Sequence, residues 1–188
     1  MPIIALTIMT SAPGLMRVID GEWETACLPI GENGRHGVIT RIAFDGEDMQ
    51  ATAQVYATRA CLAPTFMIRF SGAIKEVAEG DPMPFSYRVT RIDLTPQDQA
   101  VVDQYNRVDG QRHGCGLSGW KLNSPQSVAG QECTPFKFAT AGTIMYDSRW
   151  TASDGSIRFG AFPMIWSNDT SLNRPAKPIP VVYVPVNP

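Results

Sequence analysis

The sequence predicts a mainly β protein, folded as an antiparallel up-and-down barrel of about eight strands with one inserted α-helix. Three observations predict this fold class. Apolar and polar residues alternate along several segments, clusters of Gly, Pro, Asn and Asp separate those segments, and one segment stands out by its helical spacing. A sandwich would carry a similar pattern, but a barrel is favoured because successive hairpins build it directly and closure leaves no exposed edge.

Alternation of apolar and polar side chains defines the predicted strands. In one of them Phe66, Ile68 and Phe70 share a face, opposite Arg69 and Ser71. A period of two is the geometry of a strand with one buried side. The segments with this character are residues 22–28, 37–44, 49–57, 66–77, 85–94, 136–147, 156–162 and 180–186.

The single predicted helix covers residues 96–107. Thr95 is a residue type that caps helix N-termini, and Pro96 suits the first helical position because its fixed φ is already helical. Val102 and Tyr105 are three residues apart and would lie on one apolar stripe. The sequence therefore indicates a short amphipathic helix inserted between strands.

Chain length predicts a single β-barrel domain over residues 21–188. The 188 residues suffice for one domain with a core and are few for two. Residues 1–20 are predicted to be a separate N-terminal segment, either a signal-peptide remnant or an extra strand. An apolar run at 3–9 and small residues at 10–12 favour the remnant, whereas no Lys or Arg precedes the run.

The charge and hydropathy of the sequence argue against a nucleic acid partner and against a membrane-spanning helix. The net charge is −2, and no basic stripe is present that would attract nucleic acid. No apolar segment reaches the length of a membrane-spanning helix, so no integral membrane segment is expected. The sequence names no protein partner.

The four cysteines, Cys27, Cys61, Cys115 and Cys133, predict two disulfides and an extracellular or periplasmic location. Their spacing is wide, and no Cys-x-x-Cys pair of a redox or zinc motif is present. Three pairings are possible, and the order along the chain favours Cys27–Cys61 with Cys115–Cys133. The alternative is four reduced, buried cysteines in a cytosolic protein.

The first third of the chain resembles a known family. Gly21-Glu22-Trp23 resembles the Gly-x-Trp motif that opens the first strand of lipocalins and other calycins. The spacing from Trp23 to Cys27, followed by Tyr56 and by Cys61-x-x-Pro64, is similar to the barrel domains of the adenomatosis polyposis coli down-regulated protein and to uncharacterised bacterial secreted proteins. This resemblance implies a lipocalin-like barrel, structural roles for Trp23 and the cysteines, and a lipid-like ligand. The inserted helix departs from a simple lipocalin, in which the helix follows the barrel strands.

Seven side chains are predicted to face the interior and to line a ligand site. Alanines alternate along the neighbouring segment 49–57, so large residues face small ones. Such an arrangement either interdigitates into a filled core or leaves a cavity. The predicted ligand-binding residues are Val55, Phe66, Ile68, Phe70, Phe85, Tyr87 and Tyr146.

The predicted function is that of a secreted or periplasmic binding protein for a small apolar or amphipathic ligand. A filled barrel that acts as an interaction or inhibitor module through surface loops is the alternative, motivated by Trp150 and Trp166. A carbohydrate-active or other hydrolase is a minor alternative, because Glu22 and Glu24 share a strand face.

No catalytic residue, cofactor or metal ligand is predicted. His36 and His113 lie in Gly-rich stretches without a second ligand at helical or strand spacing. No Gly-x-Ser-x-Gly nucleophile elbow is present. Asn168-Asp169-Thr170 matches the acceptor sequence for N-glycosylation, which matters only in a eukaryotic secretory host.

Overall fold

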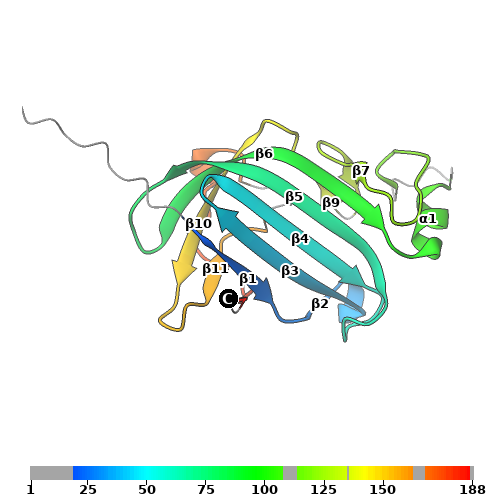
Figure 1. The fold of residues 1–188 in the computed structure, drawn as a ribbon, viewed down its shortest axis with the longest axis horizontal. Helices are drawn as coiled ribbons and strands as arrows, with labels where there is room; N and C mark the ends of the chain where they lie inside the picture. Colours follow the sequence, from blue (N-terminus) through cyan, green and yellow to red (C-terminus); the bar gives the residue numbers. More distant parts are fainter. Residues whose placement is uncertain (1–18, 108–113, 135, 163–167, 187–188) are drawn as a thin grey trace, which may run out of the picture.

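Eight antiparallel strands form a closed barrel, which confirms the predicted fold class (Figure 1). The computed structural model describes residues 19–107, 114–134, 136–162 and 168–186. Neighbours around the barrel are consecutive along the chain, so the topology is up-and-down. Most of the predicted segment 1–20 lies outside the described residues. The barrel strands, in order, are β1 (Gly21–Thr25), β3 (His36–Asp45), β4 (Asp48–Tyr56), β5 (Pro64–Val77), β6 (Met83–Pro96), β10 (Ile144–Thr151), β11 (Ile157–Phe159) and β12 (Tyr183–Pro185).

The short strand β1 closes the barrel because it pairs on both sides. Trp23 lies opposite Ile42 of β3 and opposite Pro185 of β12. The Trp23 ring is buried and packs edge-on against Phe44, with ring centroids 6.2 Å apart. Its indole Nε1 donates to the carbonyl of Gly155, in the turn between β10 and β11, at 3.2 Å. The Trp23 side chain therefore ties the first strand to β3 and to the turn between β10 and β11.

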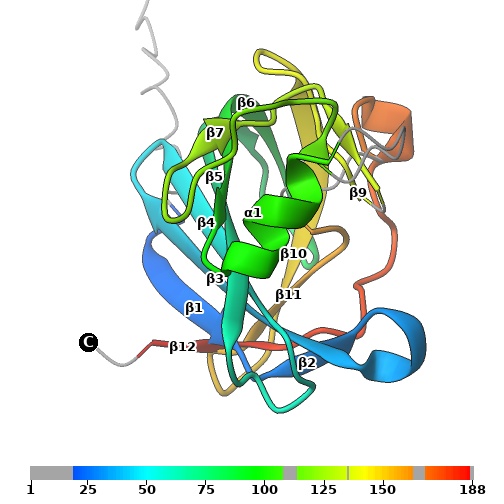
Figure 2. The ribbon, with the colours of Figure 1, turned by 90° about the vertical axis from the view of Figure 1, so that its right-hand side faces the viewer.

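Smaller elements decorate the barrel. β2 (Leu28–Ile30) pairs with β3, and β7 (Gln126–Ser127) pairs with β6. β8 (Glu132–Cys133) and β9 (Phe136–Lys137) form a separate ladder. In Figure 2, α1 (Gln99–Tyr105) lies in front of the barrel strands, at the end where β6 finishes.

The helix begins later than the sequence predicts. Thr95 and Pro96 are still part of β6, where they pair with Met67 and Phe66 of β5. Asp98 is the N-cap, and its side chain accepts from the amide of Ala100 at 2.7 Å. Strand pairing to β5 therefore outweighs the local capping preference of Thr95-Pro96.

Aromatic rings fill one half of the barrel interior. Phe44 has Phe85 and Phe159 as neighbours, each with ring centroids about 6 Å away, and Phe159 contacts Tyr183 at 5.3 Å. Tyr87 packs edge-on against Phe70 at 5.7 Å and stacks with Phe85 at 5.8 Å. Edge-to-face and offset pairs of this kind each contribute about 0.5–1.5 kcal/mol beyond their buried area. This half of the barrel is a packed core.

Both favoured disulfides are present, which confirms the predicted pairing. Cys27–Cys61 joins the segment before β2 to the loop after β4, with Cα atoms 5.9 Å apart. A Cβ at Gly37 would lie 2.7 Å from the Cys61 sulfur, so only glycine lets this bond pack over β3. Cys115–Cys133 spans the irregular segment between α1 and β9. The two bonds hold loops that make few ladder contacts of their own.

Substitutions of two adjacent residues on β5 should distinguish the inner face of the barrel wall from its outer face. Phe70 is fully buried, so Phe70→Ala should lower the free energy of unfolding by about 3–5 kcal/mol. Arg69→Ala, one residue away on the exposed face, should change it by less than about 0.5 kcal/mol. Denaturant unfolding followed by Trp fluorescence measures both values. Equal losses would contradict the assignment of the faces.

Removal of each disulfide should destabilise the fold according to the length of the loop it closes. The paired substitution Cys27→Ala/Cys61→Ala, at a separation of 34 residues, should cost about 4 kcal/mol. Cys115→Ala/Cys133→Ala, at a separation of 18, should cost about 3 kcal/mol. Denaturant midpoints measure the losses. Chemical reduction of the unaltered protein serves as the control and should reproduce their combined effect, whereas an unchanged midpoint would contradict the structural role of the bonds.

Candidate functional site

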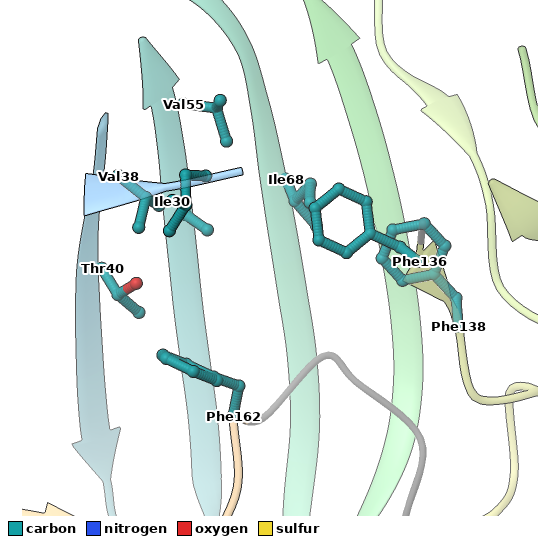
Figure 3. Close-up of a pocket in the computed structure, with 9 residues that line it drawn as sticks. Ile30, Val38, Thr40, Val55, Ile68, Phe136, Phe138 and Phe162 are labelled. Atoms are coloured by element: carbon teal, nitrogen blue, oxygen red, sulfur yellow. The ribbon is translucent and has the colours of Figure 1, made fainter. Parts of the chain in front are cut away.

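A partly open apolar pocket of about 90 Å³ lies beside β3, β4 and β5, and Figure 3 shows the side chains that line it. The inner faces of β3, β4 and β5 form its wall, and β2, β9 and the segment after β11 supply the remaining side chains. The accessible lining that the described residues provide is entirely apolar. The lining residues are Ile30, Val38, Thr40, Ala53, Val55, Ile68, Phe136, Phe138 and Phe162.

The pocket exists because the barrel strands present only small and medium side chains at this level. Ala53 lies between Thr40 of β3 and Ile68 of β5. Two residues along β4, Ala51 lies opposite Phe70, which is fully buried and whose ring lies over Gly72. Ala53 has no aromatic residue opposite it on either neighbouring strand, and a pocket remains there.

Two of the predicted ligand-binding residues, Val55 and Ile68, line the pocket. Phe66 pairs with Val55 and is half-buried against the core, beside the pocket but not in its lining. Phe70 and Phe85 lie in the filled half, where their contacts are with other rings. These positions separate the predicted set into a pocket group and a core group.

Tyr87 and Tyr146, the other two predicted residues, have different surroundings. Tyr87 is fully buried in the filled half. The prediction that Tyr146 faces the interior is wrong: Met145 and Asp147 point inward, and the ring of Tyr146 lies on the outer side, 5.4 Å from the guanidinium carbon of Arg174. Which residues of β10 point inward is hard to predict from the sequence, because one of them is an aspartate.

Sequence reasoning missed most of the lining. Val38 and Ala53 could have been found, because they continue the inward alternation that includes Val55. Phe136, Phe138 and Phe162 come from short or irregular segments without a period-two pattern. Only the tertiary arrangement brings them to the pocket.

A buried carboxyl group lies in the interior near the pocket. Asp147 Oδ1 accepts from the amides of Ser148 and Gly160 at 2.7 and 2.9 Å. Burial nevertheless raises the pKa of Asp147 to about 7, against the opposing effects of these hydrogen bonds and of Arg174. Burial, reinforced by the charge of Asp147, also raises the pKa of Tyr87 and Tyr183.

The asparagine of the glycosylation acceptor sequence is buried. Asn168 is 0% exposed, and its Nδ2 donates to the carbonyl of Tyr146 at 2.7 Å. Its backbone carbonyl accepts from the Tyr146 amide at 2.8 Å. An oligosaccharide on Asn168 would require this part of the fold to open.

The other residues singled out in the sequence have ordinary structural surroundings. His36 is the first residue of β3 and is half-buried. Its Nδ1 donates to the carbonyl of Ala57 at 3.2 Å, and its Nε2 accepts from Arg35. Glu22 and Glu24 flank Arg41 on the outer face, at 3.4 and 3.0 Å. Such exposed pairs contribute little stability.

Three other residues singled out in the sequence are either half-buried or outside the described residues. Trp150 is half-buried, and His113 and Trp166 lie outside the described residues. Within the described ranges, no three His, Cys, Asp or Glu side chains are grouped so that they could hold a metal ion. No helix in the same part of the chain combines the length and apolar character needed to cross a membrane.

The raised pKa of Asp147 predicts a pH dependence of stability. Between about pH 4 and 7 the folded protein binds this proton and the unfolded chain releases it, so the free energy of unfolding should fall as pH rises. The slope is at most about 1.4 kcal/mol per pH unit. Asp147→Asn should remove it, as measured by denaturant unfolding at each pH.

Asp154→Asn is the matched control for this measurement. Asp154 is exposed and its pKa is lowered by Ser156, so it does not titrate in the same window. The slope should survive in Asp154→Asn. Its persistence in Asp147→Asn would contradict the assignment to Asp147.

Comparison with known proteins leaves the family resemblance as a prediction. No protein-family model matches the chain, and no curated protein matches it in sequence. The closed eight-stranded antiparallel barrel is consistent with a lipocalin-like fold.

Proposed function

We propose that the protein is a secreted or periplasmic binding protein that holds a small apolar or amphipathic ligand in its barrel, with residues 21–188 acting as one domain. The observation that carries the proposal is the division of the interior. One half is packed with rings, whereas the other contains an open pocket with an apolar lining. An apolar pocket left open in an otherwise dense core costs packing energy, which favours a functional reason for it.

The size and chemistry of the pocket limit the ligand. A volume of about 90 Å³ suits a small ring or a short alkyl chain, or the end of a longer chain that leaves through the mouth. Phe136, Phe138 and Phe162 give flat apolar faces, and Thr40 is the only polar side chain among the described residues of the lining. Contacts with the ligand body are therefore van der Waals and hydrophobic.

The disulfides support an oxidising compartment and a preformed site. Disulfides persist outside the reducing cytosol, which is the basis for proposing an extracellular or periplasmic location. Cys27 immediately precedes β2, whose Ile30 lines the pocket, and its partner Cys61 follows β4, which carries Val55. A covalent bond beside the pocket reduces the loss of chain entropy when a ligand binds.

Ethylbenzene is a suitable first probe, because its ring and short chain match the pocket. A titration of isotopically labelled protein should shift the methyl resonances of Val38, Val55 and Ile68 saturably. Ala53→Phe should abolish these shifts, since the added ring would occupy the pocket, with little loss of stability because it fills a void. Resonances of the filled half, such as those of Met49, should move less.

Ala43→Phe is the matched control, since Ala43 lies on the outer side of the adjacent strand β3. The same substitution there should leave binding intact. The proposed function is refuted if ethylbenzene produces no saturable shifts in the unaltered protein. It is also refuted if Ala53→Phe folds normally and still binds.

A further inference from the structure

A leucine is exposed on the loop between β4 and β5, and we call residues 57–63 the leucine loop. The side chain of Leu62 is 63% exposed, which leaves apolar surface in water. The loop lies with β2 at one end of the barrel (Figure 1), because Cys61 is bonded to Cys27 just before β2. Ile30 of β2 and Val55 of β4 line the pocket, so the leucine loop is at the pocket end.

Hydrogen bonds and a disulfide close the leucine loop on itself. The amide of Ala57 donates to the carbonyl of Ala63 at 2.9 Å, which joins the two ends of the loop. Within it, the amide of Leu62 donates to the hydroxyl of Thr58 at 3.1 Å. The disulfide at Cys61 fastens the loop to the neighbouring segment. Leu62 is therefore presented on a preformed support.

The backbone is strained on both sides of Leu62. Cys61 has a φ of 54° and Ala63 a φ of 58°, in the left-handed region that residues other than glycine rarely adopt. Such conformations persist only where the surrounding structure enforces them, and they concentrate at functional sites. The fold therefore maintains an exposed leucine at a conformational cost.

Two exposed arginines accompany the leucine. Arg59 belongs to the leucine loop, and Arg35 follows the 3₁₀ turn η1 (Glu32–Gly34). Arg35 Nε donates to His36 Nε2 at 2.9 Å, and His36 Nδ1 donates to the carbonyl of Ala57 at 3.2 Å, which places Arg35 beside the loop. Among the described residues, neither arginine has a carboxylate within ion-pair distance. Glu32 is the only acidic residue from η1 to His36 and in the loop, so positive charge prevails here.

An anionic lipid surface fits this arrangement better than a protein surface does. A stable protein interface buries roughly 1,200–2,000 Å² around a cluster of apolar anchors. The leucine loop offers a single large apolar side chain, Leu62, on an otherwise polar and charged loop. A bilayer interface requires no larger area, because it takes up one apolar side chain below its headgroups while its phosphates attract cations.

We propose that the leucine loop docks the protein on an anionic lipid surface, with Leu62 inserted at the boundary of headgroups and acyl chains and with Arg35 and Arg59 against the phosphates. One leucine and two cations make this attachment weak and reversible. The proposal goes beyond the function proposed for the pocket and rests on the loop alone.

Co-sedimentation with phosphatidylcholine vesicles that contain phosphatidylglycerol measures the docking as a partition coefficient. Leu62→Ser should lower this coefficient roughly 10-fold, the usual effect of no longer burying a leucine side chain. Arg35→Gln and Arg59→Gln should each lower it about 5-fold, the usual effect of one cation near an anionic surface. Vesicles of phosphatidylcholine alone should bind the unaltered protein more weakly.

Leu172→Ser is the matched control. Leu172 lies in η3 (Ser171–Asn173), beside β10, and is 95% exposed, so it is more exposed than Leu62. The arginine that follows it, Arg174, is engaged with the carbonyls of Phe85 and Asp147. Leu172→Ser should leave the partition coefficient unchanged. Both leucines are on the surface, so neither serine variant should change the Tm appreciably.

Vesicles that carry a spin-labelled lipid identify the docking surface directly. The methyl resonances of Leu62 should show stronger paramagnetic relaxation than those of Leu172. Equal relaxation of the two, or an equal loss of partitioning in the two serine variants, would overturn the proposal. Failure of the unaltered protein to bind anionic vesicles would also overturn it and would make a protein the alternative partner of the loop. Neither measurement uses ethylbenzene, so failure here leaves the proposed function of the pocket intact.

Discussion

Closure of the sheet through β1 is the constraint on which the rest of the structure depends. This strand has only five residues, yet it pairs with β3 on one side and with β12, the last strand, on the other. An interior exists only when both pairings form, because an open sheet would expose its inner face and two edges. Trp23 adds a buried ring and a hydrogen bond to the turn at Gly155. Closure thus joins β1 to β12, which are far apart along the chain.

Once the barrel is closed, the size of each inward side chain decides whether the interior is filled. Phe44, Phe85 and Phe159 meet in one half and leave no room. In the other half Ala53 has only Thr40 and Ile68 beside it across the strands, so a pocket remains. Packing in the filled half stabilises the whole barrel, including the half that contains the pocket, because the free energy of unfolding is a property of the whole cooperative domain.

The polar interior has a cost that the packed rings and disulfides offset. A buried hydroxyl without a partner loses its hydration, and a buried carboxyl resists ionisation. Asp147 recovers part of this loss from the amides of Ser148 and Gly160. Side-chain hydrogen bonds with Asn168 and Thr40 offset only part of the effect of burial on the pKa of Tyr87 and Tyr183. These groups therefore reduce the stability that the packed core provides.

The sequence by itself predicted most of the strands and the face of most inward residues, because a period of two is a local property of a strand. It did not predict that residues 136–147 are divided between the two-residue β9 and β10, which begins at Ile144. Order along the chain favoured the two cysteine pairs that form. Only the tertiary structure decided the rest. Strand pairing moved the helix start from Thr95-Pro96 to Asp98, and an inward aspartate at 147 placed Tyr146 outside. The pocket depends on register across strands and on Phe136, Phe138 and Phe162, which lie far from β3–β5 in the chain and meet them only because the barrel closes.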